Sequence, residues 1–398
     1  MMKKTLSVVT LLAAGASQAA GFAFDTHSGR ATGMSFATAA VTDDSTAIAF
    51  NVANILGVKK LDIALGDVTT LPQISFTPEN GTKQTMDTTV VPPPHAFFVH
   101  RLSDTLAAGI GLYTPFAAGA NWKPDFPYRT RGYKARIATY FINPSVAYQP
   151  HKDVRFGVGL DIVRGTVGIT RKINFIDTEG TAELGGGGWG LSYNAGLNVV
   201  LVDKLLNFGA TFRGPTKMKF KGSADFQDIP AAFQGTLVDQ PITANVTLPA
   251  AAQLGFGITP MDRLTIGVDA HVTMWSTFQD FGIEFQDPSL TSILPKNWKD
   301  GWSIHVGGEY GVTDTIAVRL GAEYDPAPTP SDTLTPDLPD FDRYSASVGL
   351  GFNFEPIRAD LGYQFVLLHH TDSTAPGFEG FYDGVANVMG LTVGYTMK

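Results

Sequence analysis

Hydrophobic and polar residues alternate over many segments of this chain. Residues 264–272 read Leu-Thr-Ile-Gly-Val-Asp-Ala-His-Val, and residues 154–162, 316–324, 346–354 and 357–365 follow the same pattern. A period of two places successive side chains on opposite faces of a β-strand. The pattern therefore predicts an all-β protein whose strands each have one apolar face.

The second face of these strands decides which kind of β-protein this is. It consists mainly of Gly, Ser, Thr and Asn, with single charges such as Asp161 and Glu323. A soluble sandwich presents charged and long polar residues to solvent, whereas a membrane barrel turns apolar residues to lipid and small polar residues inward. Lipid cannot satisfy unpaired backbone amides, so the sheet must also close on itself. We therefore predict a transmembrane antiparallel β-barrel.

The connections between the strands alternate in length. Six joints are very short, at residues 103–104, 151–153, 203–204, 260–262, 313–314 and 355–356. Seven longer polar segments lie between them, near residues 72–93, 114–136, 171–187, 221–245, 279–299, 326–342 and 369–385. Short turns at one end and long loops at the other are typical of the periplasmic and external ends of such a barrel. This alternation predicts about fourteen strands, with both termini in the periplasm.

Aromatic residues lie near both ends of the predicted strands. The residues beside short turns are Tyr148, Tyr310 and Phe354, and those near long loops are Tyr113, Trp275, Trp302, Tyr324 and Tyr344. Two girdles of aromatic side chains are expected where a barrel wall meets the two membrane interfaces. We predict that these residues form the girdles.

The first residues have the pattern of a secretory signal. Lys3 and Lys4 precede a short apolar stretch, residues 6–16, and Ser17-Gln18-Ala19 places small residues at both positions that a signal peptidase reads. We predict cleavage after Ala19, so that residues 1–19 are a signal peptide of a protein exported to the bacterial outer membrane.

Composition excludes some functions. The net charge of −8 argues against a nucleic-acid partner, which would require a basic face. The chain has no Cys, so disulfides and thiolate chemistry are absent. We see no cofactor motif and expect neither a cofactor nor a bound metal.

Residues 20–58 do not alternate and are rich in Ala, Gly, Ser and Thr. Irregular backbone is tolerated at membrane depth only where it is buried in protein or lines a cavity. We therefore predict that this segment folds into the barrel lumen as an N-terminal hatch, or plug, and that residues 59–398 form the transmembrane barrel.

Several motifs occur in the order found in one known family. They are Ala20-Gly21-Phe22, residues 28–34, residues 43–47, residues 50–53, residues 143–148, residues 298–302, residues 319–325 and residues 338–343. Together they resemble the FadL-type outer-membrane transporters of long-chain fatty acids over nearly the whole mature chain. The family's Asn-Pro-Ala triplet appears here as Asn51-Val52-Ala53, so the proline that would fix φ is missing. The chain also ends without the usual terminal aromatic residue, and we expect the barrel assembly machinery to read Tyr395 instead.

The resemblance implies passive uptake of long-chain fatty acids or similar hydrophobic molecules, without enzymatic activity. It implies external capture, a binding site in the lumen and release controlled by the hatch, with Phe22 and the triplet Asn51-Val52-Ala53 as gating residues. It also implies a lateral opening at a kinked strand. Pro144 lies within a predicted strand and cannot donate to a ladder, so we expect an irregular wall there. Outer-membrane lipid and lipopolysaccharide surround such a barrel, and we expect a monomer.

Alternative functions remain at this point. The barrel could carry monoaromatic hydrocarbons, or be a structural or adhesive surface protein. A lipid-acting barrel enzyme would need a nucleophile near Asp269, His271, His305 and Glu309, and no G-x-S-x-G motif occurs. Gly185, Gly187 and Gly190 match a dinucleotide motif, but an alternating segment follows them instead of a helix, so we expect a flexible loop entering a strand. His369 and His370 with Asp372 and Asp383 could bind a metal, although adjacent strand residues point to opposite faces.

Three arginines on inward faces are candidates for binding a ligand carboxylate: Arg155, Arg319 and Arg358. The competing hypothesis is that they form lumen salt bridges with Asp161, Glu323 and Asp360.

Overall fold

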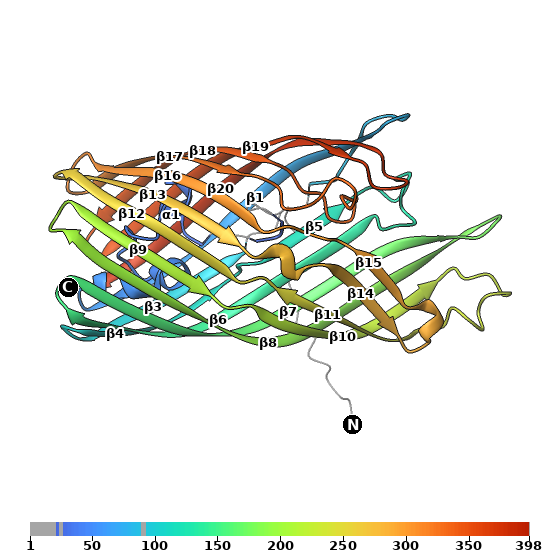
Figure 1. The fold of residues 1–398 in the computed structure, drawn as a ribbon, viewed down its shortest axis with the longest axis horizontal. Coiled ribbons are helices and arrows are strands. Elements are labelled where there is room, and N and C mark those ends of the chain that lie inside the picture. The colour runs from blue at the N-terminus through green and yellow to red at the C-terminus, as the bar shows by residue number, and fades with distance from the viewer. Residues whose placement is uncertain (1–20, 24–26, 89–92, 398) are drawn as a thin grey trace, which may run out of the picture.

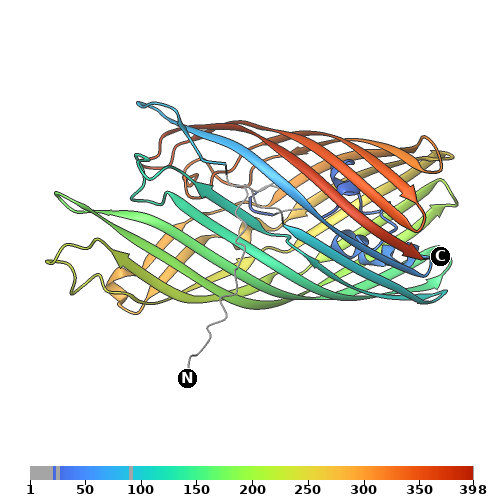
Figure 2. The same ribbon diagram turned by 180° about the vertical axis from the view of Figure 1, so that it is seen from behind.

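The structure is a computed structural model that describes residues 21–23, 27–88 and 93–397. These residues form one long barrel, with helical N-terminal residues inside the end at which the chain terminates (Figures 1 and 2). The predicted signal peptide, residues 1–19, lies outside the described residues. Within the described ranges, no helix is both long and apolar enough to span a membrane.

The wall is a closed antiparallel barrel of 14 strands, which confirms the prediction. The wall strands, with the parts of interrupted strands joined by a plus sign, are β1 (Leu61–Pro78), β3 (Pro94–Ser103), β4 (Leu106–Tyr113) + β5 (Ala117–Asn121), β6 (Lys134–His151), β7 (Val154–Asn174), β8 (Glu179–Val202), β9 (Leu206–Arg213) + β10 (Thr216–Gln227), β11 (Gln240–Leu248) + β12 (Ala251–Met261), β13 (Leu264–Thr273) + β14 (Asp280–Phe285), β15 (Ser292–Pro295) + β16 (Gly301–Gly311), β17 (Ile316–Asp325), β18 (Arg343–Phe354), β19 (Ile357–Ser373) and β20 (Gly380–Met397). The pairing of β1 with β20, from Leu61 opposite Met397 to Pro78 opposite Gly380, closes the barrel. A short strand, β2 (Gln84–Thr85), pairs with the end of β1.

The apolar faces of the strands point outward, as predicted. Val158 is 55% exposed, whereas Asp161 on the same strand is fully buried inside. On β17, Leu320 is 67% exposed while its neighbour Arg319 is 5% exposed. The barrel therefore has an apolar outer surface and a polar inner one, which is the arrangement that lipid requires.

All six predicted short joints connect neighbouring strands. The long connection at residues 326–342 has the predicted bounds, whereas strands extend into the other six predicted segments. Residues 171–187 belong mostly to a hairpin in which β7 extends to Asn174 and β8 begins at Glu179. Gly185, Gly187 and Gly190 therefore lie inside β8, and the expected loop is wrong. The reason is that polar residues beyond the membrane still form a complete ladder, so polarity there indicates solvent and not a loop.

The predicted aromatic girdles are partly correct. Tyr148, Tyr310 and Phe354 are exposed near the short turns, and Trp302 and Tyr344 are exposed towards the long loops. Tyr113 and Trp275 are wrong, because both side chains are buried inside the barrel. Tyr113 follows the exposed Leu112 and so lies on the inward face of β4, and Trp275 begins the 3-10 helix η2 (Trp275–Thr277) that interrupts its wall strand.

Residues 27–58, here called the N-terminal segment, contain the short helices α1 (Gly29–Thr32), α2 (Ala47–Phe50) and η1 (Val52–Gly57). They lie within the short-turn end of the barrel (Figure 1). The backbone of the segment lies directly against inward glycines of the wall. An added Cβ at Gly267 would lie 2.5 Å from the Ala37 carbonyl oxygen, and one at Gly157 would lie 2.6 Å from the Ala53 nitrogen. The wall therefore accommodates the segment only because side chains are missing there.

We predict that Gly209→Val displaces the N-terminal segment, because a Cβ at this position collides with the carbonyl oxygen of Ala39. Overpacking of this kind costs about 1–3 kcal/mol. Single-barrel conductance in planar bilayers should rise, and the free energy of unfolding should fall by that amount. Gly308→Val is the matched control, since its Cβ would lie no closer than 3.8 Å to the Thr265 carbonyl oxygen. Equal conductance of the two variants would contradict the prediction.

Candidate functional site

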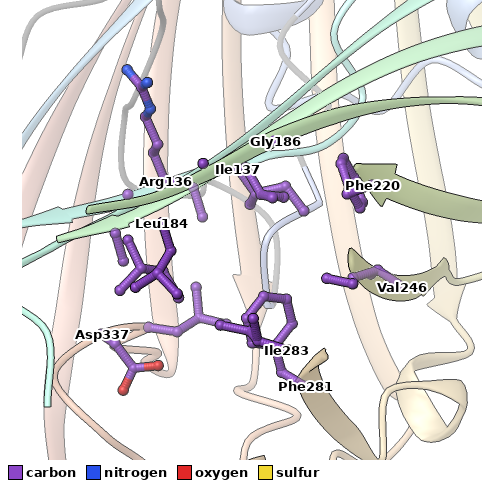
Figure 3. A pocket seen from close by; sticks show the side chains of 18 of the residues that line it. Arg136, Ile137, Leu184, Gly186, Phe220, Val246, Phe281, Ile283 and Asp337 are labelled. Atoms are coloured by element: carbon purple, nitrogen blue, oxygen red, sulfur yellow. The ribbon is translucent and has the colours of Figure 1, made fainter. Parts of the chain in front are cut away.

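An apolar cavity lies inside the barrel, between the N-terminal residues and the long loops. Its walls are the inward residues of β6, β7, β8, β10, β11 and β14. Figure 3 shows the labelled side chains that converge on it: Ile137, Leu184, Phe220, Val246, Phe281 and Ile283. Such a lining can accept an alkyl or aromatic ligand through the hydrophobic effect.

Small residues make room for the cavity. Ala118, Gly119, Ala135, Gly186 and Ala244 line it with a methyl group or with no side chain at all. They come from β5, β6, β8 and β11, which belong to one continuous run of neighbouring wall strands. The sequence shows that many inward residues are small. It does not show which of them meet at the same height of the barrel.

The inner end of the cavity is formed by Phe22 and a cage of aromatic rings. The Phe22 ring lies 4.4 Å from that of Trp275 and 5.5 Å from that of Phe278, and the rings of Phe116 and Trp298 complete the cage. The backbone of Phe22 is also attached to the wall, because the Ala117 nitrogen donates to the Phe22 carbonyl oxygen over 3.1 Å. Phe22, predicted from the sequence as a gating residue, thus separates the cavity from the N-terminal segment.

Lys296 supplies a buried positive charge at the cavity. Its ammonium group lies 3.0 Å from Asp337 Oδ2 and 3.2 Å from Thr335 Oγ1. Burial alone would raise the pKa of the Asp337 carboxyl group, but the charge of Lys296 together with hydrogen bonds from Thr335 and Lys296 outweighs this, and the pKa lies below its ordinary value. An ammonium group has three donors, so one remains for a ligand after these two contacts. Sequence reasoning missed Lys296 because it lies between strands, where no alternation marks an inward position.

The three predicted arginines lie elsewhere. Arg319 contacts Glu309 over 2.5 Å and Asp360 over 2.7 Å, and Arg358 forms an ion pair with Asp62. These contacts belong to a charged network below the N-terminal segment, which joins it through Arg30 and its 2.9 Å contact with Glu309.

Arg155 lines a separate polar cavity together with residues such as Asn54 and Asn198. Two of the acidic residues that we expected to pair with these arginines have other partners. Asp161 pairs with Arg213, and Glu323 accepts a hydrogen bond from Gln364. None of the three predicted arginines lines the apolar cavity.

The triplet Asn51-Val52-Ala53 lies where the N-terminal segment meets β7 and β8. The Asn51 amide donates to the carbonyl oxygens of Ala39 and Leu197, and its side-chain oxygen accepts from the Ala53 nitrogen. Asn51 therefore fixes the turn through side-chain hydrogen bonds at the position where the family's proline is missing.

The wall is irregular near Pro144 and on the strand beside it. The ladder between β6 and β7 lacks pairs at Asn143 and Pro144, although its register is unchanged on either side. The adjacent wall strand is interrupted after Tyr113 and resumes as β5 at Ala117. In the described residues β5 forms a ladder with β6 alone. Its other edge is contacted by the Phe22 carbonyl oxygen and, at Asn121, by the Asp87 nitrogen.

His305, one of the histidines considered for a lipid-acting enzyme, lies beside a serine. Ser303 Oγ lies 2.7 Å from His305 Nε2, but His305 Nδ1 lies 2.8 Å from the Ser35 carbonyl oxygen and 4.0 Å from Glu323. Ser303 and His305 are both buried against the N-terminal segment, which favours a packing role over substrate access.

The rings of His369 and His370 face different neighbours, Tyr344 and Phe381. Among the described residues, no group of three acidic or histidine side chains is arranged to hold a metal ion.

Comparison with known proteins gives consistent matches over the full length of the barrel. The family described as "Outer membrane protein transport protein (OMPP1/FadL/TodX)" matches residues 10–397. The long-chain fatty acid transport protein of Salmonella typhi is 23% identical, covering 92% of this chain and 91% of its own length. The crystal structure of a FadL homologue from Pseudomonas aeruginosa has a TM-score of 0.87 at 20% identity, covering 95% of this chain and 100% of its own. That of the toluene transporter TodX from P. putida has a TM-score of 0.73 at 17% identity, covering 94% and 99%.

We predict that Arg319→Gln destabilises the barrel without affecting a ligand in the apolar cavity. The change removes the buried cation between Glu309 and Asp360 and leaves them only Arg30 and Arg358, so we expect a loss below the ~3–5 kcal/mol of a fully broken buried pair but above that of an exposed one. Urea unfolding in lipid vesicles would measure this loss, and quenching of tryptophan fluorescence by a bound alkyl ligand would measure affinity. Arg263→Gln, which breaks the exposed 2.6 Å pair with Asp314, should cost at most about 1 kcal/mol. A large loss of ligand affinity in the Arg319 variant would contradict this prediction and support Arg319 as a residue that binds the ligand carboxylate.

Proposed function

The chain belongs to the outer-membrane transport protein family OMPP1/FadL/TodX, and from this we propose that it carries long-chain fatty acids or similar hydrophobic molecules passively across the bacterial outer membrane. The observation that carries the proposal is the apolar cavity with the buried cation Lys296 at its edge. An apolar space with an ammonium donor at its edge fits an alkyl chain that ends in a carboxylate.

The energetics support storage of an alkyl chain in this cavity. Burial contributes about 0.8 kcal/mol per CH₂, so a sixteen-carbon chain would gain on the order of 12 kcal/mol before ordering costs are subtracted. A water-filled pore provides no such gain. A wide unobstructed channel would therefore be a poor solution for this cargo, and the N-terminal segment prevents one.

The first capture of ligand is proposed to occur at an external groove near the long loops. Its lining combines Arg171 and Lys172 of one hairpin with apolar side chains from two others: Phe226, Leu237, Phe285 and Leu290. Cations beside an apolar surface suit an amphipathic anion arriving from outside. From there the ligand would move down its gradient into the apolar cavity.

Release is proposed to require movement of the first residues of the hatch, for which we retain the boundaries 20–58. Phe22 and its aromatic cage form the inner end of the cavity, while the turn at Asn51-Val52-Ala53 is held against the wall glycines Gly157 and Gly196. These contacts favour local movement at Phe22 over displacement of the whole segment.

The proposed exit is lateral, at the interruption between β4 and β5. There Ala23 forms an isolated bridge with Phe116, and Phe22 contacts the edge of β5. Movement of these two residues would uncover an unpaired strand edge beside the cavity. This moves the exit from Pro144, our first candidate, to the neighbouring wall strand.

The main alternative keeps the barrel and changes the cargo to monoaromatic hydrocarbons, since the fold is shared with a toluene transporter. Lys296 is the observation against it, because toluene has no charge to pair. A structural or adhesive role would not require an internal apolar cavity. An enzymatic role is disfavoured by the buried Ser303 and His305, and we propose transport without catalysis. We further propose that the barrel is a monomer inserted by the barrel assembly machinery.

A strain that lacks the protein should regain growth on oleate when the wild type is restored. Lys296→Gln should weaken oleate binding at least about tenfold, since a charge-assisted hydrogen bond is lost, while oleyl alcohol binding stays the same. The double variant Lys296→Gln/Asp337→Asn, which removes both buried charges, controls for instability from an unpaired carboxylate. Equal losses for oleate and oleyl alcohol, or rescue of growth on toluene but not on oleate, would contradict the proposal.

A disulfide between Ala23→Cys and Phe116→Cys should block transport, because it fixes the residue after Phe22 to the wall at the interruption between β4 and β5. The natural chain has no cysteine, so no other disulfide competes. Paired positions on adjacent strands lie within the range that a disulfide can bridge. Uptake of radiolabelled oleate should fall under oxidation and return with a reductant, and neither single-cysteine variant should respond. Unchanged uptake by the oxidised double variant would exclude this exit.

A further inference from the structure

Five positive side chains gather on the outward face of adjacent wall strands. They come from β6, β7 and β10, and they are Arg136, Arg164, Lys217, Lys219 and Lys221. The three lysines alternate with the buried Met218 and Phe220, so all three point away from the lumen. Figure 3 likewise shows the Arg136 guanidinium group pointing away from the other side chains that line the cavity. We call these five residues the cationic patch.

The strand registers bring the members of the patch together around β8. Arg164 is opposite Trp189 of β8, and Lys221 is opposite Gly187, two residues earlier on the same strand. On the other side of β7, Arg136 is opposite Gly168. The patch therefore crosses the ladder of neighbouring strands and is not a single row of lysines.

Two glycines make a shallow floor between these cations. A Cβ at Gly187 would collide with the Arg164 guanidinium group, and a Cβ at Gly168 would lie 3.0 Å from Arg136 Nε. Both guanidinium groups therefore lie flat over bare backbone. Arg164 also donates to the Gly188 carbonyl oxygen over 3.0 Å and lies 5.6 Å from the centre of the Trp189 ring. These contacts hold its planar group parallel to the wall.

The patch has no acidic partner within the described part of the chain, because no carboxylate lies within 4.0 Å of any of the five cations. This is unusual in a chain of net charge −8, in which Lys and Arg total 29 against 37 Asp and Glu. The nearest outward acidic residue in register is Glu284, which is level with Lys221 across Thr243, and Glu183 and Asp225 lie opposite each other further towards the long loops. The five cations thus form a local group of unpaired positive charge on the outer surface.

The height of the cationic patch identifies its surroundings. Directly on its membrane side, the outward residues are apolar, with Leu191 67% and Tyr193 54% exposed. A Lys or Arg side chain is strongly unfavourable at the bilayer midplane of a barrel and nearly neutral at the interface. The five cations therefore lie where the external headgroups of the membrane meet the wall.

We propose that the cationic patch binds the phosphate groups of lipopolysaccharide, the phosphorylated glycolipid of the outer leaflet. Planar guanidinium groups bind phosphate through two parallel hydrogen bonds, and lysines add point charges that tolerate variation in position. The glycine floor gives a sugar headgroup close access to the wall, and Trp189 provides an amphipathic ring at the same level. The proposal depends on the outer-membrane location and is independent of which molecule the barrel transports.

The test measures binding of lipid A that carries both phosphates to the purified full chain in a neutral detergent, by native mass spectrometry. The variant Lys217→Gln/Lys219→Gln/Lys221→Gln should bind on the order of 100-fold more weakly, because each cation near an anionic surface contributes about fivefold. Chemically dephosphorylated lipid A should bind the wild type and the variant equally weakly.

The matched control is Lys60→Gln/Lys152→Gln/Lys204→Gln, which removes the same charge from exposed positions at the short-turn end. It should bind lipid A as the wild type does. If the patch triple variant does not fold, Lys219→Gln alone should still show a loss of about fivefold.

Three outcomes would overturn the proposal. The first is equal binding of lipid A by the wild type and the patch variant, and the second is an equal loss in the short-turn control. The third is a patch variant that retains lipid A binding but loses oleate uptake, which would make the patch a capture site for carboxylates.

Discussion

The structure depends on the close contact between the backbone of the N-terminal segment and the inner wall of the barrel. A barrel of 14 strands is wide enough to need a filling. Here the filling touches the wall at Gly157, Gly209 and Gly267, where any side chain would collide with it. Close packing of this kind excludes water without a large apolar core. It also explains why the inward face of the strands is rich in glycine, a composition that polarity alone does not require.

This contact divides the interior into two regions with different chemistry. Towards the short turns, Arg319 and Arg358 are neutralised by carboxylates in a network that includes Arg30 of the segment. Towards the long loops, the lining is apolar, and Lys296 with Asp337 provides its buried ion pair. Buried charges are costly unless they are paired, and here the pairs hold the segment in position. The same charges offer no apolar surface to an alkyl chain. The cavity, in contrast, suits such a chain.

The fold could be predicted from the sequence because the signals that specify it are local. Alternation determines which face meets lipid, and tight turns determine where strands end. The errors arose where local signals depend on three-dimensional position. The polar residues around Asn174 and Glu179 predict a loop, yet they continue a hairpin in solvent. Trp275 lies at a strand end like a girdle residue, but the interruption by η2 turns it inward.

The candidate site was less predictable for the same physical reason. An arginine on an inward strand face is visible in the sequence, but whether a carboxylate already neutralises it depends on strands far apart in the chain, as with Arg319 and Asp360. Lys296 lies between strands, so no periodicity reveals that it is buried. Phe22 was recognisable only through resemblance to a family, and its aromatic cage comes from residues far away in the chain: Phe116, Trp275, Phe278 and Trp298.

The two regions of the interior also bear on the direction of release. A chain that left the cavity through the short-turn end would exchange apolar contacts for the charged network, losing about 0.8 kcal/mol for each CH₂ exposed. A chain that left beside β5 would move from apolar lining to the apolar membrane interior and lose little. That route requires a wall strand whose edge is not held by a second wall strand. Among the described residues β5 forms a ladder with β6 alone, and its other edge is contacted by Phe22 and Asp87. The same hydrophobic effect that stabilises the ligand in the cavity thus favours the proposed lateral path over an axial one.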